Sequence, residues 1–136
     1  MDKKTRIAVF VSGGGTTLQA IIDAEKSGII KSGKTELVIS DNPEAYALER
    51  AKANGIKTAV VLKNNGQAEF EKKISEILAE NKIEMIILAG FMCILSADFT
   101  SKWPERIINI HPSLIPSFCG KGCYGLHVHE KALAYG

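Results

Sequence analysis

Short apolar runs alternate with amphipathic segments along the chain, and this alternation constrains the fold more than any other feature. Residues 7–11 form a continuous apolar run that ends at Ser12 and Gly13, which is typical of a strand buried on both faces of a parallel sheet. Similar runs predict strands at 36–40, 57–62, 85–89 and 107–110. Apolar residues at helical spacing predict helices at 17–28, 43–54, 70–78 and 97–102. The alternation predicts a single α/β domain over residues 1–136, with a doubly wound, mostly parallel sheet.

Local signals give the expected ends and faces of these elements. Asn42 is expected to cap a helix whose first helical residue is Pro43. Gly33-Lys34 and residues 64–66 are typical of turns. The charged residues of the third helix are expected to form a solvated face opposite its apolar stripe: Glu71, Lys72, Lys73 and Glu76.

Composition and charge exclude several classes of protein. A chain that is 46% hydrophobic and 24% charged is an ordinary globular sequence, not a disordered one. The net charge is only +2 and both signs interleave along the chain, which argues against nucleic acid as a partner. No apolar run approaches the ~18 residues of a membrane span. Three cysteines, none before Cys93, are typical of reduced thiols in a cytoplasmic protein.

A glycine-rich segment, residues 12–17, follows the first predicted strand at an edge where open parallel sheets bind ligands. Glycines such as Gly15 let backbone N–H groups approach a phosphate, while Thr16 and Thr17 can add hydroxyl donors at the start of a helix. The segment lacks the Gly-Lys-Ser/Thr of a Walker loop and the spacing of a dinucleotide fingerprint. A phosphate site and a tight turn without a ligand both fit these residues.

Asn109 and His111 form a second candidate constellation, at the end of the last predicted strand. Alternate residues of a strand point the same way, and Pro112 favours an extended conformation for the residue before it. A neutral imidazole can move a proton at pH 7, and a carboxamide can donate hydrogen bonds to an oxygen that gains charge. The pair suits acyl transfer to an amine, although a histidine at a strand end is often only structural. Serine-hydrolase chemistry is disfavoured because the chain has no Gly-x-Ser-x-Gly elbow.

The tail of the chain offers a competing metal-site hypothesis. Its possible zinc ligands are Cys119, Cys123, His127 and His129. Their spacing lacks the long separation usual between ligand pairs, so we expect no bound metal. Cys93 is expected to be a small buried hydrophobe.

Three motifs together resemble the phosphoribosylglycinamide formyltransferase family. The first runs from Ser12 to Ile21 (SGGGTTLQAI), the second from Ile87 to Met92 (ILAGFM), and the third from Asn109 to Pro116 (NIHPSLIP). The resemblance covers the whole chain in order, and its third motif is specific to folate-dependent formyltransferases.

The resemblance implies a Rossmann-like formyltransferase fold and a reaction without a metal. A formyl group would pass from 10-formyltetrahydrofolate, the co-substrate, to the amine of phosphoribosylglycinamide in de novo purine biosynthesis. Asn109 and His111 would be catalytic, with Asn109 stabilising the oxyanion and His111 serving in proton transfer. The remaining roles fall on two sets: substrate binding by Gly15, Thr16, Thr17 and Pro112, and folate binding by Phe91, Met92, Cys93, Ile94, Leu95 and Asn109.

The sequence departs from the family pattern at single positions and in length. Thr17 stands where many members have Asn, Cys93 where many have Arg, and Gln67 where some have an Arg near the folate. Family members run roughly half as long again, so their further strands, a catalytic Asp that orients the His, and a closing helix are expected beyond Gly136. The chain would then be a C-terminally truncated form, about two-thirds of the family's length, with doubtful activity of its own.

Two alternatives stay open at this level. One is a related folate-dependent formyltransferase acting on another amine; the other is a non-catalytic fragment that binds a phosphate ligand. A sheet shortened by truncation would also expose an edge strand, which invites assembly into a homo-oligomer.

Overall fold

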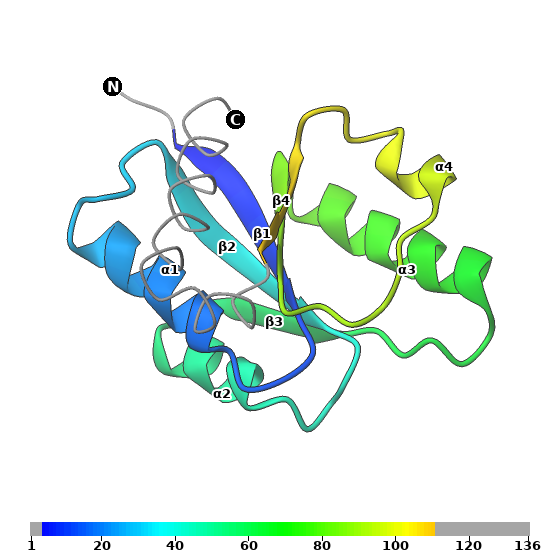
Figure 1. Cartoon of the computed structure of the whole chain (residues 1–136), viewed down its shortest axis with the longest axis horizontal. Helices are drawn as coiled ribbons and strands as arrows, with labels where there is room; N and C mark the ends of the chain where they lie inside the picture. The colour runs from blue at the N-terminus through cyan, green and yellow to red at the C-terminus, as the bar shows by residue number, and fades with distance from the viewer. Residues whose placement is uncertain (1–3, 111–136) are drawn as a thin grey trace, which may run out of the picture.

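The protein, described from a computed structural model that places residues 4–110, is a layered α/β structure (Figure 1). Its strands are β1 (Thr5–Val11), β2 (Gly33–Ser40), β3 (Lys57–Val60), β4 (Met85–Ala89) and β5 (Ile107–Ile110). Its helices are α1 (Thr16–Lys26), α2 (Tyr46–Ala53), α3 (Gln67–Glu80) and α4 (Ala97–Thr100). Every strand and helix expected from the sequence is present, so the predicted α/β alternation is confirmed.

The five strands form one parallel sheet in the order β3-β2-β1-β4-β5. The chain moves outward from β1 through β2 to β3, and then returns to the other side of β1 with β4. Strand order therefore reverses between β1 and β4. In open parallel sheets such a switch point leaves a crevice at the carboxyl ends of the strands, where ligands bind.

Each face of the sheet has its own apolar core. Val9, Val38 and Ile87 point to one face and pack with buried residues of α1 and α2. Phe10 and Ile86 point to the opposite face and pack with buried residues of α3 and α4. The central strand β1 is buried on both sides, as its unbroken apolar sequence predicts, and Figure 1 shows the helices on both faces.

Two local expectations are wrong. Residues 42–44 do not begin a helix: Asn42 Oδ1 accepts from the Glu44 N–H at 3.0 Å in a turn, and α2 begins only at Tyr46. Gly33-Lys34 is not a turn but the start of β2, opposite Thr5 and Arg6. A Cβ at position 33 would lie 2.6 Å from Ile7 Cδ1, so a larger residue there would require the end of the Ile7 side chain to move.

Two elements are shorter than expected. β3 ends at Val60 rather than Leu62, and α4 is a single turn that ends at Thr100 rather than Lys102. Within the described residues no helix is both long and apolar enough to cross a membrane.

Candidate functional site

The glycine segment after β1 and the segment after β4 meet at the switch point of the sheet. Ser12 Oγ accepts a hydrogen bond of 2.8 Å from the Met92 N–H, although the two residues are 80 positions apart in the chain. Both segments follow carboxyl ends of neighbouring strands. Strand order thus brings these two segments together at one edge of the sheet.

The glycine loop, residues 12–15, is held through its carbonyl groups. The carbonyl of Ser12 accepts from Asn42 Nδ2 at 3.3 Å, and that of Gly13 accepts from the Ala47 N–H at 3.0 Å. The Gly14 carbonyl accepts from Arg50 Nε at 2.7 Å. Three successive carbonyls are thus engaged by the segment that leads into α2 and by α2 itself.

The N–H groups at the start of α1 remain available on this loop. The first helical hydrogen bond runs from the Gln19 N–H to the Gly15 carbonyl, and among residues 4–110 none starts from the N–H of residues 16–18. No side chain caps this helix. Engaged carbonyls and unengaged N–H groups are the arrangement that suits an anion at the N-terminus of a helix.

The three glycines of the loop have different structural requirements. Gly15 has φ +78°, and a Cβ there would lie 2.6 Å from Ala47 Cβ, so the fold itself requires glycine. Gly13 and Gly14 lie outside the left-handed region of φ, and a Cβ on either would meet nothing within 4 Å among the described residues. Packing thus explains Gly15, whereas it gives no reason for Gly13 or Gly14.

The neighbouring segment, residues 91–96, presents large apolar side chains to solvent. Met92 and Ile94 are 80% and 79% exposed. Phe91 anchors the segment by edge contact with Phe10 and by stacking on Phe70, with ring centroids 5.3 Å and 6.4 Å apart. The exposed pair therefore sits on a fixed backbone beside the crevice, where an apolar ligand would find contact area.

Cys93 is not the buried hydrophobe expected from the sequence. It is half-buried, and its Sγ donates to Asp41 Oδ2 at 2.9 Å. Burial, and then the hydrogen bond and charge of Asp41, raise the pKa of the Cys93 thiol to about 11. The thiol is thus held in its protonated, unreactive form.

Asp41 joins the site from the carboxyl end of β2, and sequence analysis missed it. Its second carboxylate oxygen, Oδ1, is buried without a hydrogen-bond partner among the described residues. An acid directly after a central strand was the signal available for it.

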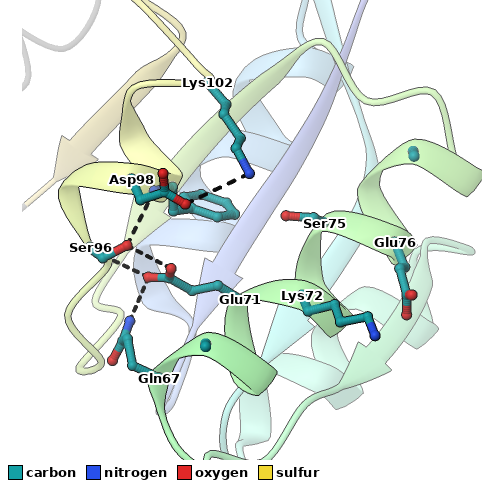
Figure 2. A pocket seen from close by; sticks show the side chains of 11 residues that line it. Gln67, Glu71, Lys72, Ser75, Glu76, Ser96, Asp98 and Lys102 are labelled. Carbon is teal, nitrogen blue, oxygen red and sulfur yellow. Dashed lines mark hydrogen bonds and ion pairs between the residues drawn. The ribbon is translucent and has the colours of Figure 1, made fainter.

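Glu71 corrects the expectation that the charges of α3 form one solvated face. Its side chain is buried, and it accepts hydrogen bonds from the Ser96 N–H and from Ser96 Oγ, each 2.6 Å long. Gln67 Nε2 donates to the same carboxylate at 2.5 Å and to the Ile94 carbonyl at 2.8 Å. Figure 2 shows these side chains converging between α3 and the segment that enters α4.

The pKa of Glu71 is lowered despite its burial. Desolvation by burial raises it, but the two hydrogen bonds from Ser96, the one from Gln67 and the charge of Lys63 more than offset this effect. Glu71 is therefore a carboxylate at neutral pH. Only the helical i, i+4 spacing of Gln67 and Glu71 beside Phe70 hinted at such a contact.

A hollow of about 640 Å³ lies between α3 and α4, with Glu71 and Ser96 in its lining (Figure 2). Cations and anions both line it, including Lys72, Glu76 and Lys102. None of the expected binding residues that the structure describes lines this hollow. The candidate site is instead the crevice at the switch point.

Asn109 lies in β5 on the same side of the sheet as α3 and the 91–96 segment. It is exposed and pairs in register with Leu88, while Ile108 and Ile110 turn to the other face. The expected partners His111 and Pro112 lie outside the described residues. So do the possible zinc ligands of the tail, and within residues 4–110 no group of three His, Cys, Asp or Glu side chains could hold a metal ion.

Comparison with known proteins gives a consistent set of relatives. The model of the formyl transferase family matches residues 5–136. A phosphoribosylglycinamide formyltransferase of Haemophilus influenzae is 44% identical over 133 residues, which are 96% of this chain and 60% of that protein. The human trifunctional purine biosynthetic protein adenosine-3 is 40% identical over 98% of this chain and 13% of its own length.

Solved structures agree with these relatives. The crystal structure of phosphoribosylglycinamide formyltransferase from Brucella melitensis is similar with a TM-score of 0.77 and 38% identity, over 98% of this chain and 68% of that one. A formyltetrahydrofolate deformylase from Pseudomonas putida, at 21% identity and a TM-score of 0.74, shares the fold. The chain spans about 60% of the length of the bacterial curated relatives that it matches.

Proposed function

Because the chain belongs to the formyl transferase family, with phosphoribosylglycinamide formyltransferases among its relatives, we propose that it serves formyl transfer to the amine of phosphoribosylglycinamide. The donor is 10-formyltetrahydrofolate. The amine nitrogen bonds to the formyl carbon, the bond from that carbon to the folate nitrogen breaks, and one proton moves from the amine to the departing nitrogen. The reaction needs groups that bind a phosphate, hold a folate and stabilise an oxyanion.

The observation that carries the proposal is the meeting of two unlike surfaces at one switch point. The glycine loop offers unengaged N–H groups to an anion, and the 91–96 segment offers exposed apolar side chains. A 2.8 Å hydrogen bond from the Met92 N–H to Ser12 Oγ joins the two segments. A ribonucleotide phosphate suits the first surface and a folate ring suits the second. The two substrates would then lie side by side in the crevice.

Each candidate residue has a stated role in this proposal. Gly15, Thr16 and Thr17 bind the phosphate, and Pro112 contributes to the substrate site. The folate is contacted by Phe91, Met92, Cys93, Ile94, Leu95 and Asn109. Asn109 donates to the oxyanion that forms as the amine attacks, and His111 moves the proton. Cytoplasmic location and homo-oligomer assembly stay predictions.

The phosphate site can be tested by titration of the chain with glycinamide ribonucleotide, followed by amide NMR. The resonances of residues 13–18 should shift before most others, and added salt should weaken the effect because the interaction is charged. Inorganic phosphate should shift the same group of resonances at higher concentration. Unchanged resonances at millimolar ribonucleotide would refute the phosphate assignment.

The catalytic assignment needs a turnover assay on the protein expressed from the complete reading frame of its gene. Asn109→Ala should lower turnover about a hundredfold, as loss of one oxyanion donor does, and leave the fold intact. His111→Ala should have at least as large an effect. Normal turnover in either variant would show that the residue is misassigned. A preference for an amine other than phosphoribosylglycinamide as acceptor would favour the alternative of a related formyltransferase.

A further inference from the structure

The buried carboxylate of Glu71 has no place in the reaction itself, yet it is bound to the segment that carries the proposed folate contacts. It lies on α3 and contacts Ser96, at one end of the 91–96 segment, whereas the glycine loop contacts Met92 near the other end. Keeping a carboxylate out of water costs free energy unless donors replace the water. Three donors do so here, two from Ser96 and one from Gln67.

These hydrogen bonds fix the second half of the 91–96 segment. Ser96 is held through both its backbone N–H and its hydroxyl group, at 2.6 Å each. Gln67 donates to Glu71 and to the Ile94 carbonyl, so it links the carboxylate to the backbone beside the exposed Ile94 side chain. The first half is fixed separately, through Met92 to Ser12 and through Cys93 to Asp41.

We propose that Glu71, assisted by Gln67, is a positioning residue that sets the backbone of residues 94–96 and thereby the folate-contacting surface. The inference rests on the proposed function for the identity of the ligand. Glu71 touches no substrate in this scheme. It acts through Ser96 and Ile94, and ionised oxygen acceptors give the strong, short hydrogen bonds that such positioning needs.

Ser96 also accepts from the Phe99 N–H at 3.2 Å and so caps the single turn α4. A purely structural role for Glu71, as the support of this turn, would lower stability without favouring one substrate over the other. A positioning role should therefore raise the Michaelis constant for the folate alone, whereas a structural role should affect both substrates alike.

The test compares Glu71→Gln with Glu76→Gln, a matched change at an exposed acid of the same helix. The neutral amide keeps the size of the side chain but removes its charge, and its single oxygen can no longer accept from both the backbone N–H and the hydroxyl of Ser96 as the two carboxylate oxygens do. In the protein from the complete reading frame, Glu71→Gln should raise the KM for 10-formyltetrahydrofolate about tenfold, in line with loss of a charged hydrogen bond. The KM for the ribonucleotide should stay within about twofold, and Glu76→Gln should change neither.

If Glu71→Gln folds poorly, a second variant and a second measurement still test the proposal. Gln67→Ala removes only a half-buried amide and should raise the folate KM about threefold while the chain stays folded. Amide hydrogen exchange on the 136-residue chain should show faster exchange at Ser96 in Glu71→Gln and unchanged exchange at residues 13–18.

The outcomes distinguish failure of this inference from failure of the proposed function. Equal increases of both Michaelis constants, or a lower melting temperature with an unchanged folate KM in both variants, would overturn the positioning role. Absence of formyl transfer by the wild-type protein would instead refute the proposed function. In that case unchanged exchange at Ser96 in Glu71→Gln would overturn the inference by itself.

Discussion

The glycine loop and the 91–96 segment border the same crevice but are held by different means. The loop is fixed mainly through its own carbonyl groups, with donors from Asn42, Ala47 and Arg50. The 91–96 segment is fixed mainly by acidic and polar side chains, among them Asp41, Gln67 and Glu71. Because the loop is held through its carbonyl groups, its N–H groups stay available for an anion. Because the 91–96 segment is held by polar side chains from other elements, its own apolar side chains stay available for the ring of a folate.

The two segments should therefore be destabilised by different kinds of substitution. A loop packed by its backbone against a helix tolerates no Cβ at the contact, because there is no side chain to move aside. A segment held by buried acids depends on single ionised groups and on their protonation. Changes to each region should therefore fail in different ways.

The largest expected effect is on the glycine loop. Gly15→Val should lower the free energy of unfolding by about 3 kcal/mol, because a β-branched residue is strained at φ +78° and its Cβ would lie 2.6 Å from Ala47. Gly14→Ala is the matched control, with open space for a Cβ and a shift below about 0.5 kcal/mol. Urea unfolding gives the free energy of unfolding of both variants. A Gly15→Val variant as stable as Gly14→Ala would show that packing does not require glycine at position 15.

A second effect concerns protonation within the 91–96 segment. With its pKa raised to about 11 from an ordinary 9.0, Cys93 in the folded chain should be alkylated about a hundredfold more slowly at pH 8 than in urea. The folded state keeps this proton where the unfolded state loses it, so the stability from this group is complete below pH 9 and is lost as pH rises toward 11.

Peptide mass analysis of the Cys93 fragment measures the alkylation rate. Asp41→Asn is the informative variant, because it removes the charge that helps to raise the pKa while it keeps the shape of the side chain. Alkylation should then be faster. Equal rates in the folded wild type and in urea would show that the Cys93–Asp41 contact does not hold in solution.

The smallest expected effect is on Arg50, which donates to the Gly14 carbonyl and stacks on Tyr46 with its guanidinium carbon 5.1 Å from the ring centroid. Arg50→Ala should weaken phosphate binding about fivefold, equivalent to about 1 kcal/mol for one hydrogen bond. Lys52→Ala, on the same helix and paired with the exposed Glu49, is the control and should change binding little. Phosphate titration followed at residues 13–18 compares the two, and equal behaviour would remove Arg50 from the support of the loop.

The order of the elements, and the edge of the sheet that carries the site, can be predicted from the sequence. Unbroken apolar runs such as 7–11 predict central parallel strands. The carboxyl ends of parallel strands lie at the same edge of a sheet, whatever side chains the strands carry. The positions of the glycine loop, the 91–96 segment and Asn109 follow from that rule. These signals are local in sequence, and so they could be read directly.

Which polar residues are buried, and whether Gly33 lies in a turn or in a strand, depend on contacts that form only in the folded chain. Glu71 has the sequence context of a solvated helical acid, and it is buried only because Ser96, 25 positions away, brings two donors to it. Gly33 has the context of a turn, yet it lies in β2, where it pairs in register with Thr5 of β1. Both outcomes depend on contacts between distant segments, and local propensity carries no information about such contacts until strand order and register are set.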